Sequence, residues 1–357
     1  MTPKNISWQQ FLFGCGIVVF WIGIILFFLY SPQLTRGSQR RTLNILAWPQ
    51  IIDGEFLVDF EKEHGVTIKI TYFESNEELL AKLRSSRDHD YDIIMPSDFF
   101  LSTFIQEGFI KPLDKSRLTF WNDIHPQLKN LPFDPQNKYT VPCFWTVYGI
   151  GVDLDYFQGK LPELSWKLIF EPDINGPKIC LIEDVPQLVA LTALYLYGMP
   201  QVLPPYALSH IQKVLIEQKK RVVAYTDMRV EYLLASGAAP VVVATSSDMA
   251  KMVDYYENIA FFIPKEGSLV IIDSFVIAAD TKKDDLIYDF LNYLYKPEIM
   301  KQYAQKFTFP SPLSSVTIDY PLSQAIFTAD NMPPLYFIQR WFSTAQYEKI
   351  WVALRTA

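Results

Sequence analysis

The chain of 357 residues is half hydrophobic and 15% aromatic, which is enough for two domains with substantial apolar cores. Its formal net charge of −7 argues against a nucleic-acid partner, which would require a basic surface. The four histidines show no metal-ligand spacing and the three cysteines provide no disulfide framework, so no cofactor or metal is expected.

An uncharged apolar run occupies residues 11–30, FLFGCGIVVFWIGIILFFLY, and has the length that a helix needs to cross a bilayer. A cleaved signal peptide is the alternative, but no small-x-small cleavage site follows the run. We therefore favour an uncleaved transmembrane anchor, with a tail at residues 1–10 and a linker at 31–41.

The charges on either side of this run bear on its orientation. Arg36, Arg40 and Arg41 follow it, whereas only Lys4 precedes it. The positive-inside rule taken alone would place the C-terminal part in the cytoplasm. This opposes the extracytoplasmic location that the rest of the sequence favours.

Strand and helix patterns alternate after the linker. The expected strands are 43–48, 66–72, 91–96, 139–152, 178–182, 222–225, 241–244 and 269–278. The expected helices are 55–63, 76–85, 98–107, 161–169, 187–197, 208–220, 230–236, a segment ending near 256, 283–295 and 297–306. This alternation predicts an α/β protein with a mostly parallel sheet covered on both faces.

Polar residues at the carboxyl ends of these strands are candidate ligand contacts, because open α/β sheets bind ligands beyond those ends. The candidates are Trp48, Ser97–Asp98, Glu183–Asp184, Thr226–Asp227 and Ser246–Asp248.

Asp273 interrupts the apolar strand 269–278. An ionised carboxylate removed from water costs several kcal/mol, as an order of magnitude, unless it is paired or hydrogen-bonded. Two interpretations are equally supported. Asp273 bonds to nearby backbone N–H groups or an arginine, or it faces a cleft that receives a cationic ligand.

Several spaced motifs now resemble one known family. They are Tyr72–Glu77 followed by Ala81–Leu83, Tyr91–Ser97, Pro132–Pro135, Gly149–Val152, Lys265–Gly267 before Ile272–Ser274, and Phe309–Pro312. In this order they resemble the spermidine/putrescine-binding proteins of bacterial ABC transporters, a polyamine-binding family of extracellular solute-binding proteins. The resemblance covers about residues 43–316 and is less clear beyond them.

The resemblance implies a periplasmic-binding-protein type II fold, in which two α/β lobes enclose a ligand cleft. Mapped onto this chain, lobe I comprises 42–146 plus 272–316, and lobe II comprises 147–271 plus 317–357. Asp273 then stands directly after the second crossing between the lobes, at the cleft.

The resemblance also implies a ligand site, in which carboxylates hold ammonium groups and aromatic rings contact the methylenes. Carried over, the ligand-binding residues are Trp48, Gln50, Ser97, Phe99, Asp184, Gln187, Asp273 and Phe309. Gln50 and Gln187 stand where spermidine binders have glutamates. Ile51 replaces a tyrosine, and Ala244 and Ile271 replace two tryptophans. The expected ligand is therefore a diamine, or a singly charged or mixed ligand, rather than spermidine.

Structural roles compete with these assignments. Asp184 precedes Val-Pro-Gln in a helix-capping pattern, and Ser97 and Asp248 have the same alternative, which we prefer for Asp248. Trp48 and Phe309 are also consistent with ordinary core aromatics.

We predict a substrate-binding component of an ABC importer, which captures a polyamine or other cationic small molecule and delivers it to permease subunits. It would lie at the periplasmic or extracytoplasmic face, held at the inner membrane by its N-terminal helix. The alternative is a membrane-tethered sensor or docking module of the same fold with a non-polyamine ligand. An enzyme is least favoured, because the sequence has no GxSxG, phosphate-loop or dinucleotide-binding pattern in a suitable context.

Overall fold

A computed structural model describes residues 16, 18–27, 41–49, 51–85, 91–171, 173, 175–227, 229–317 and 333–357. Residues 18–27 are helical, with exposed apolar side chains such as Val19 and Phe20. None of the helices in these ranges combines the length and apolarity that crossing a membrane requires. The rest of the predicted span 11–30, apart from residue 16, lies outside the described residues.

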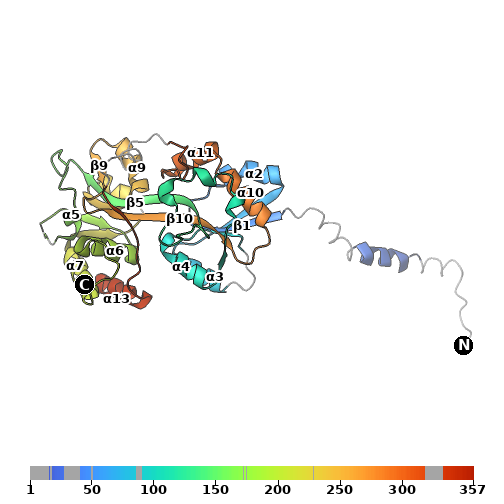
Figure 1. Cartoon of the computed structure of the whole chain (residues 1–357), viewed down its shortest axis with the longest axis horizontal. Coiled ribbons are helices and arrows are strands. Elements are labelled where there is room, and N and C mark those ends of the chain that lie inside the picture. Colours follow the sequence, from blue (N-terminus) through green and yellow to red (C-terminus); the bar gives the residue numbers. More distant parts are fainter. Residues whose placement is uncertain are drawn as a thin grey trace, which may run out of the picture.

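The main body is built on one continuous path of paired strands, β2-β1-β3-β10-β5-β8-β6-β7 (Figure 1). The strands on this path are β1 (Arg41–Ala47), β2 (Val66–Tyr72), β3 (Ile93–Ile94), β5 (Val141–Asp153), β6 (Ile179–Leu181), β7 (Val222–Tyr225), β8 (Val241–Thr245) and β10 (Ser268–Ala278). Three short strands pair beside it, namely β4 (Ile110–Lys111), β9 (Ile259–Phe262) and β11 (Leu335–Phe337).

The first half of the sheet is parallel at its outer edge, as the strand-helix alternation predicts. β1 pairs in parallel with β2 and β3, and the C-terminal half of β10 adds antiparallel to β3 and β4. Its helices are α2 (Val58–His64), α3 (Asn76–Ser85), α4 (Leu101–Gln106), α10 (Asp284–Leu294) and α11 (Pro297–Phe307). Gly65 ends α2 in the left-handed conformation at φ 59°, where a glycine avoids steric strain.

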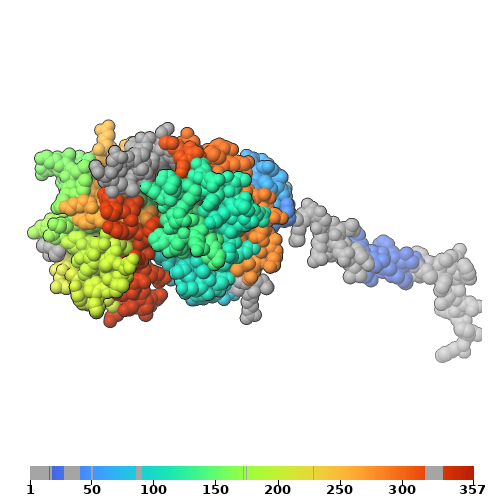
Figure 2. Space-filling view, in the orientation of Figure 1, coloured from blue at the N-terminus to red at the C-terminus, as the bar shows by residue number. Residues whose placement is uncertain are grey.

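The second half contains a parallel set formed by β8, β6 and β7. Its helices are α5 (Lys167–Phe170), α6 (Val185–Tyr197), α7 (Ala207–Gln218), α8 (Val230–Ala235), α9 (Ser246–Tyr255) and α13 (Thr344–Thr356). In Figure 2 the C-terminal residues, coloured red, run along the junction between the two halves on the visible face.

Strands β5 and β10 join the halves. They pair antiparallel from Val270 opposite Val147 to Phe275 opposite Val141, with a register shift between Asp273 and Ser274. The continuation of β5 pairs with β8 and β9, while the continuation of β10 pairs with β3 and β4. The two strands that connect the halves are therefore also paired with strands within each half.

The predicted helix 161–169 is wrong over most of its length, because α5 covers only Lys167–Phe170. The preceding segment is instead fixed by Glu266, whose carboxylate accepts hydrogen bonds from the Ser165 hydroxyl and the Trp166 backbone N–H. The Trp166 indole donates to the Gly267 carbonyl oxygen at 2.8 Å. Tertiary contacts with the β9–β10 turn thus replace helical bonds here.

The core comprises three clusters of buried side chains. One packs α10 and α11 against β1 and includes Phe60 and Phe290. The second includes Trp166 and Leu188 and extends to α4, and the third lies beneath α8 and α9 around Met249. These clusters hold the strand ends that carry the polar residues described below.

Gly149 in β5 leaves room for β9. A Cβ at this position would lie 2.3 Å from Phe261 Cζ and 2.6 Å from the Phe262 carbonyl oxygen. We expect Gly149→Ala to lower the free energy of unfolding by about 2 kcal/mol, because a backbone oxygen cannot move aside without disturbing the β5–β9 pairing. Urea denaturation measures the change. Gly54→Ala is the matched control, since a Cβ there meets nothing within 4 Å, and an equal loss in both variants would contradict the explanation.

Candidate functional site

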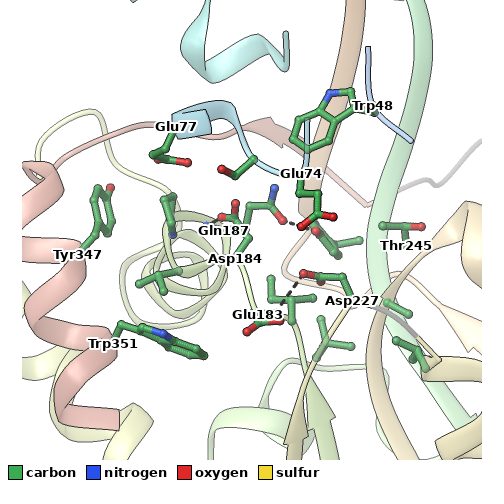
Figure 3. A pocket seen from close by; sticks show the side chains of 18 of the residues that line it. Trp48, Glu74, Glu77, Glu183, Asp184, Gln187, Asp227, Thr245, Tyr347 and Trp351 are labelled. Carbon is green, nitrogen blue, oxygen red and sulfur yellow. Dashed lines mark hydrogen bonds between the residues drawn. The ribbon is translucent and has the colours of Figure 1, made fainter. Parts of the chain in front are cut away.

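A pocket with a strongly acidic lining opens between the two halves of the molecule (Figure 3). Its volume is about 570 Å³. Seven carboxylates line it, from Glu74, Glu77, Glu183, Asp184, Asp227, Asp248 and Glu348. Arg340 is the single lysine or arginine of its lining, and the nearest approach of its guanidinium to these acids is 4.0 Å, to Glu77. We call this cavity the acidic pocket.

The acidic side chains come from both halves. Glu74 lies just before α3 and Glu77 in its first turn, while Glu183 and Asp184 follow β6 and Asp227 follows β7. In Figure 3, Glu74 and Glu77 face Glu183 and Asp227 across the pocket. Like charges therefore approach one another where a cation would be stabilised.

Aromatic rings form the apolar part of the pocket wall. Trp48 packs on Phe73 with ring centroids 4.5 Å apart, and Tyr148 contributes from β5. Tyr347 and Trp351 project from α13 on the opposite side (Figure 3). Carboxylates together with aromatic faces are the groups that bind organic ammonium ions.

A second cavity of about 1120 Å³ adjoins the first and shares Asp248 with it. Asp273 and Phe309 line it, with the Phe309 ring 3.9 Å from that of Phe144 between centroids. Its lysines are Lys251 and Lys306, and the Lys306 ammonium is paired with Asp53 and Glu55. We call this cavity the Asp273 cavity.

The Asp273 carboxylate is held from the first half of the molecule. Ser97 Oγ donates to Asp273 Oδ1 at 2.7 Å, and the two residues also form an antiparallel bridge. Burial raises the pKa of Asp273 to about 7, against the smaller lowering effects of the Ser97 hydroxyl and the Trp48 indole. The buried Trp48 indole N–H has no hydrogen-bond partner of good geometry among the described residues, so its lowering effect on this pKa is the smaller of the two. No lysine or arginine neutralises this carboxylate among the described residues.

A second buried acid lies behind Asp273. Asp98 is 1% exposed, and its Oδ1 accepts the Phe99 backbone N–H at 2.9 Å. Within the described part of the chain, its Oδ2 has no hydrogen-bond partner. Burial and the charge of Asp273 both raise the pKa of Asp98 well above its usual range. The two acids therefore oppose each other's ionisation.

The acids of the second half also resist ionisation in the ligand-free protein. Burial raises the pKa of Asp184 to about 7 and that of Asp227 to about 6. Asp227 raises the Asp184 pKa further, and Asp248 has the same effect on Asp227. Burial also raises the pKa of Asp248. A bound cation would reverse these effects by stabilising the charged carboxylates.

The structure brings together most of the residues that the resemblance implies. Trp48, Asp184 and Gln187 line the acidic pocket, whereas Asp273 and Phe309 line the Asp273 cavity. The replaced positions Ala244 and Ile271 line the first and the second cavity respectively. These placements agree with the implied cleft, but the ligand contacts themselves stay a prediction.

Three further positions differ from this grouping. Phe99 is buried and contributes to a separate cavity of about 980 Å³ beside β11, rather than to either of these two. Gln50 lies outside the described residues. Ser97 is joined to Asp273 without lining the Asp273 cavity.

The capping alternatives have mixed outcomes. Asp184 does cap α6, since its Oδ1 accepts the Gln187 backbone N–H at 2.9 Å. Ser97 makes no side-chain capping bond, because its hydroxyl goes to Asp273. Asp248 occupies the third helical position of α9 rather than the cap, which is Thr245, and completes a reciprocal capping box. The Tyr148 hydroxyl donates to Gln187 Oε1, so part of that amide's bonding capacity is already used.

Several lining residues were not singled out as ligand contacts in the sequence. They are Glu74, Glu77, Arg340, Tyr347, Glu348 and Trp351. Glu183 and Asp227, by contrast, were candidates by their position after strands of the parallel set, although the family resemblance did not carry them over. In the described residues, no group of histidine, cysteine or acidic side chains has the arrangement of a metal site.

Comparisons with known proteins agree with this architecture. Residues 88–328 match the family described as bacterial extracellular solute-binding protein. The putrescine-binding periplasmic protein PotF of Escherichia coli is 30% identical over 318 residues, covering 84% of this chain and 82% of the relative. The putrescine/agmatine-binding protein of Pseudomonas aeruginosa is 26% identical, with coverage of 77% and 79%.

A solved structure gives the same result for the fold. A putative spermidine/putrescine ABC transporter protein from Listeria monocytogenes superimposes with a TM-score of 0.74 at 26% identity, covering 88% of this chain and 99% of that one. The resemblance inferred from the spaced motifs is thereby confirmed, as is the periplasmic-binding-protein type of α/β fold. The chain belongs to the bacterial extracellular solute-binding protein family.

Proposed function

We propose that this protein is the substrate-binding component of an ABC importer and captures a polyamine or related cationic small molecule. The observation that carries the proposal is the acidic pocket, in which seven carboxylates and several aromatic rings face a space with a single guanidinium. Relatives named for putrescine, agmatine and spermidine support the same ligand class. The sensor alternative has no comparable support, and the family is one of solute-binding proteins rather than enzymes.

The ligand-binding residues in this proposal are those of the two cavities. Asp273 and Asp184 provide carboxylates, and Trp48 and Phe309 provide aromatic surface. Ser97 orients Asp273 through its hydroxyl. Gln187, Gln50 and Phe99 are assigned from the family resemblance, Phe99 against its position beside another cavity.

The two lobes, 42–146 plus 272–316 and 147–271 plus 317–357, would close on the ligand and dock on a membrane permease. Sheet topology supports this division, because β5 and β10 carry the crossings near residues 146 and 272. Part of the second segment, residues 318–332, lies outside the described residues.

The family acts outside the cytoplasm, which supports a periplasmic or extracytoplasmic location. We further propose that residues 11–30 anchor the chain to the inner membrane. Support comes from the sequence, which contains twenty uncharged residues there, and from the exposed apolar side chains of residues 18–27. A carbonate wash of membranes tests the anchor, since an anchored chain stays in the pellet.

Thermal unfolding with and without amines tests the ligand class. We expect at least one of putrescine, cadaverine, agmatine, spermidine and spermine to stabilise the chain, by about 2.7 kcal/mol at a hundredfold excess over its Kd. Neutral 1,4-butanediol serves as the control for chain length without charge. No shift with any of the five amines would overturn the polyamine proposal.

A further inference from the structure

One end of the acidic pocket has the features of a subsite for a charged end of the ligand, an assignment that rests on the proposed function. We infer that Asp227, assisted by Glu183, binds a cationic group of the ligand in a subsite between the end of β7 and helix α13. Neither residue is among the positions that the family resemblance carries over. The pair would provide charge that the glutamines at positions 50 and 187 cannot.

The backbone fixes Asp227 while leaving its carboxylate available. Its Oδ2 accepts the Glu183 backbone N–H at 3.3 Å, which ties the loop after β7 to the loop after β6. The side chain is exposed toward the pocket, and none of the described cations forms an ion pair with it. A carboxylate so placed is preorganised to meet a charged ligand group.

Asp184 is less suited to this role, although it lies in the same pocket. Its Oδ1 is engaged in capping α6, and the residue is only partly exposed. Asp248 is engaged in the capping box of α9 with Thr245. Glu183 has no such internal bond from its side chain among the described residues, and Figure 3 shows it between Asp227 and Trp351.

Helix α13 closes the side of this subsite. Trp351 packs edge-on against Tyr225 of β7 at 5.5 Å between ring centroids, which fixes the indole beside the acids. The Arg355 guanidinium lies over the Trp351 ring at 5.1 Å and helps to hold the indole in place. The subsite thus combines two carboxylates with an aromatic wall, at the end of the acidic pocket opposite Trp48.

Calorimetric titration of the full chain with putrescine, agmatine and spermidine tests the assignment. We expect Asp227→Asn to lower the affinity for the most tightly bound of these three amines about 10- to 100-fold, because a charge-assisted hydrogen bond is lost. Glu183→Gln should have a smaller effect of the same sign. The matched control is Asp254→Asn, which removes an equal charge from the exposed surface of α9 and should change affinity less than threefold.

The outcomes separate the assignment from the function on which it rests. If the wild-type chain binds an amine and Asp227→Asn binds it within threefold, the assignment is overturned and the proposed function stands. If the wild-type chain binds none of the three, the assignment is overturned, and the polyamine proposal falls with it only if cadaverine and spermine also give no thermal shift. Thermal unfolding of Asp227→Asn without ligand shows whether the variant is folded. Its unfolding temperature at neutral pH should match that of the wild type or exceed it, because the variant lacks a carboxylate whose pKa is raised in the folded protein.

Discussion

Asp273→Asn is expected to weaken binding of the preferred amine roughly 100-fold, at the upper end of what a single substitution in the two cavities should cause. Asparagine keeps the shape of the side chain and can still accept the Ser97 hydroxyl through Oδ1. It removes the charge from a site that no lysine or arginine neutralises among the described residues. Calorimetric titration gives the affinity, and the unliganded variant should unfold at the same temperature or higher.

Ser97→Ala provides the matched comparison for this result. It removes the hydrogen bond to Asp273 and keeps the charge, so the expected loss is only about three- to tenfold. Equal losses in Ser97→Ala and Asp273→Asn would mean that orientation rather than charge matters. If Asp273→Asn bound the amine within threefold of the wild-type affinity, Asp273 would not be a ligand-binding residue.

Amine affinity is expected to fall by at least about tenfold between pH 8 and pH 5. Without ligand, the pKa is about 7 for Asp273 and Asp184 and about 6 for Asp227, so these groups take up protons as the pH falls. A bound ammonium group favours the ionised carboxylates, and binding must therefore release protons. The amine itself stays charged over this range, since alkyl ammonium groups lose their proton near pH 10.

The stability of the ligand-free protein has the opposite pH dependence. The folded pKa of these acids lies above the unfolded value of about 3.8, so their contribution to stability is fully present below that pH. This contribution to stability is lost as the pH rises through 6 to 7.

The protons released on ligand binding are measured by calorimetric titrations in buffers of different ionisation enthalpy. Asp273→Asn should release fewer protons than the wild type. A flat affinity profile with no proton release would contradict these assignments.

Local signals in the sequence predicted much of the fold. Gly65 marks the end of α2, and the Asp184 pattern marks the start of α6, because both depend on bonding within a few residues. The short strands β9 and β11 were not predicted, since their edges are defined by distant partners in β5 and β10. Helix α13 was also missed, although Ser343 and Gln346 form a capping box that the sequence displays.

The site was predictable at the level of strand ends and less so at the level of individual contacts. Trp48, Asp184 and Asp227 all follow strands, and the rule for open sheets correctly brought them to one pocket. Trp351 and Glu348 could not be found in this way, because α13 reaches the pocket only through its packing on α6 and α7. The proximity of Asp98 to Asp273 could not be predicted either, because it depends on the pairing of β10 with β3, which are far apart in the sequence.

The paired strands β5 and β10 have a mechanical consequence. Because β5 and β10 are paired on both sides of Asp273, the two halves of the sheet are joined by a continuous ladder rather than by two loose segments. If the proposed lobes rotate, the motion would be taken up as twist along this ladder, and most readily at its register shift between Asp273 and Ser274. The carboxylate that we expect to meet the ligand stands at this point. Neutralisation of the Asp273 carboxylate by a bound cation and rotation of the proposed lobes would therefore act on the same few peptide units. Ligand binding would then be coupled to rotation directly at these residues.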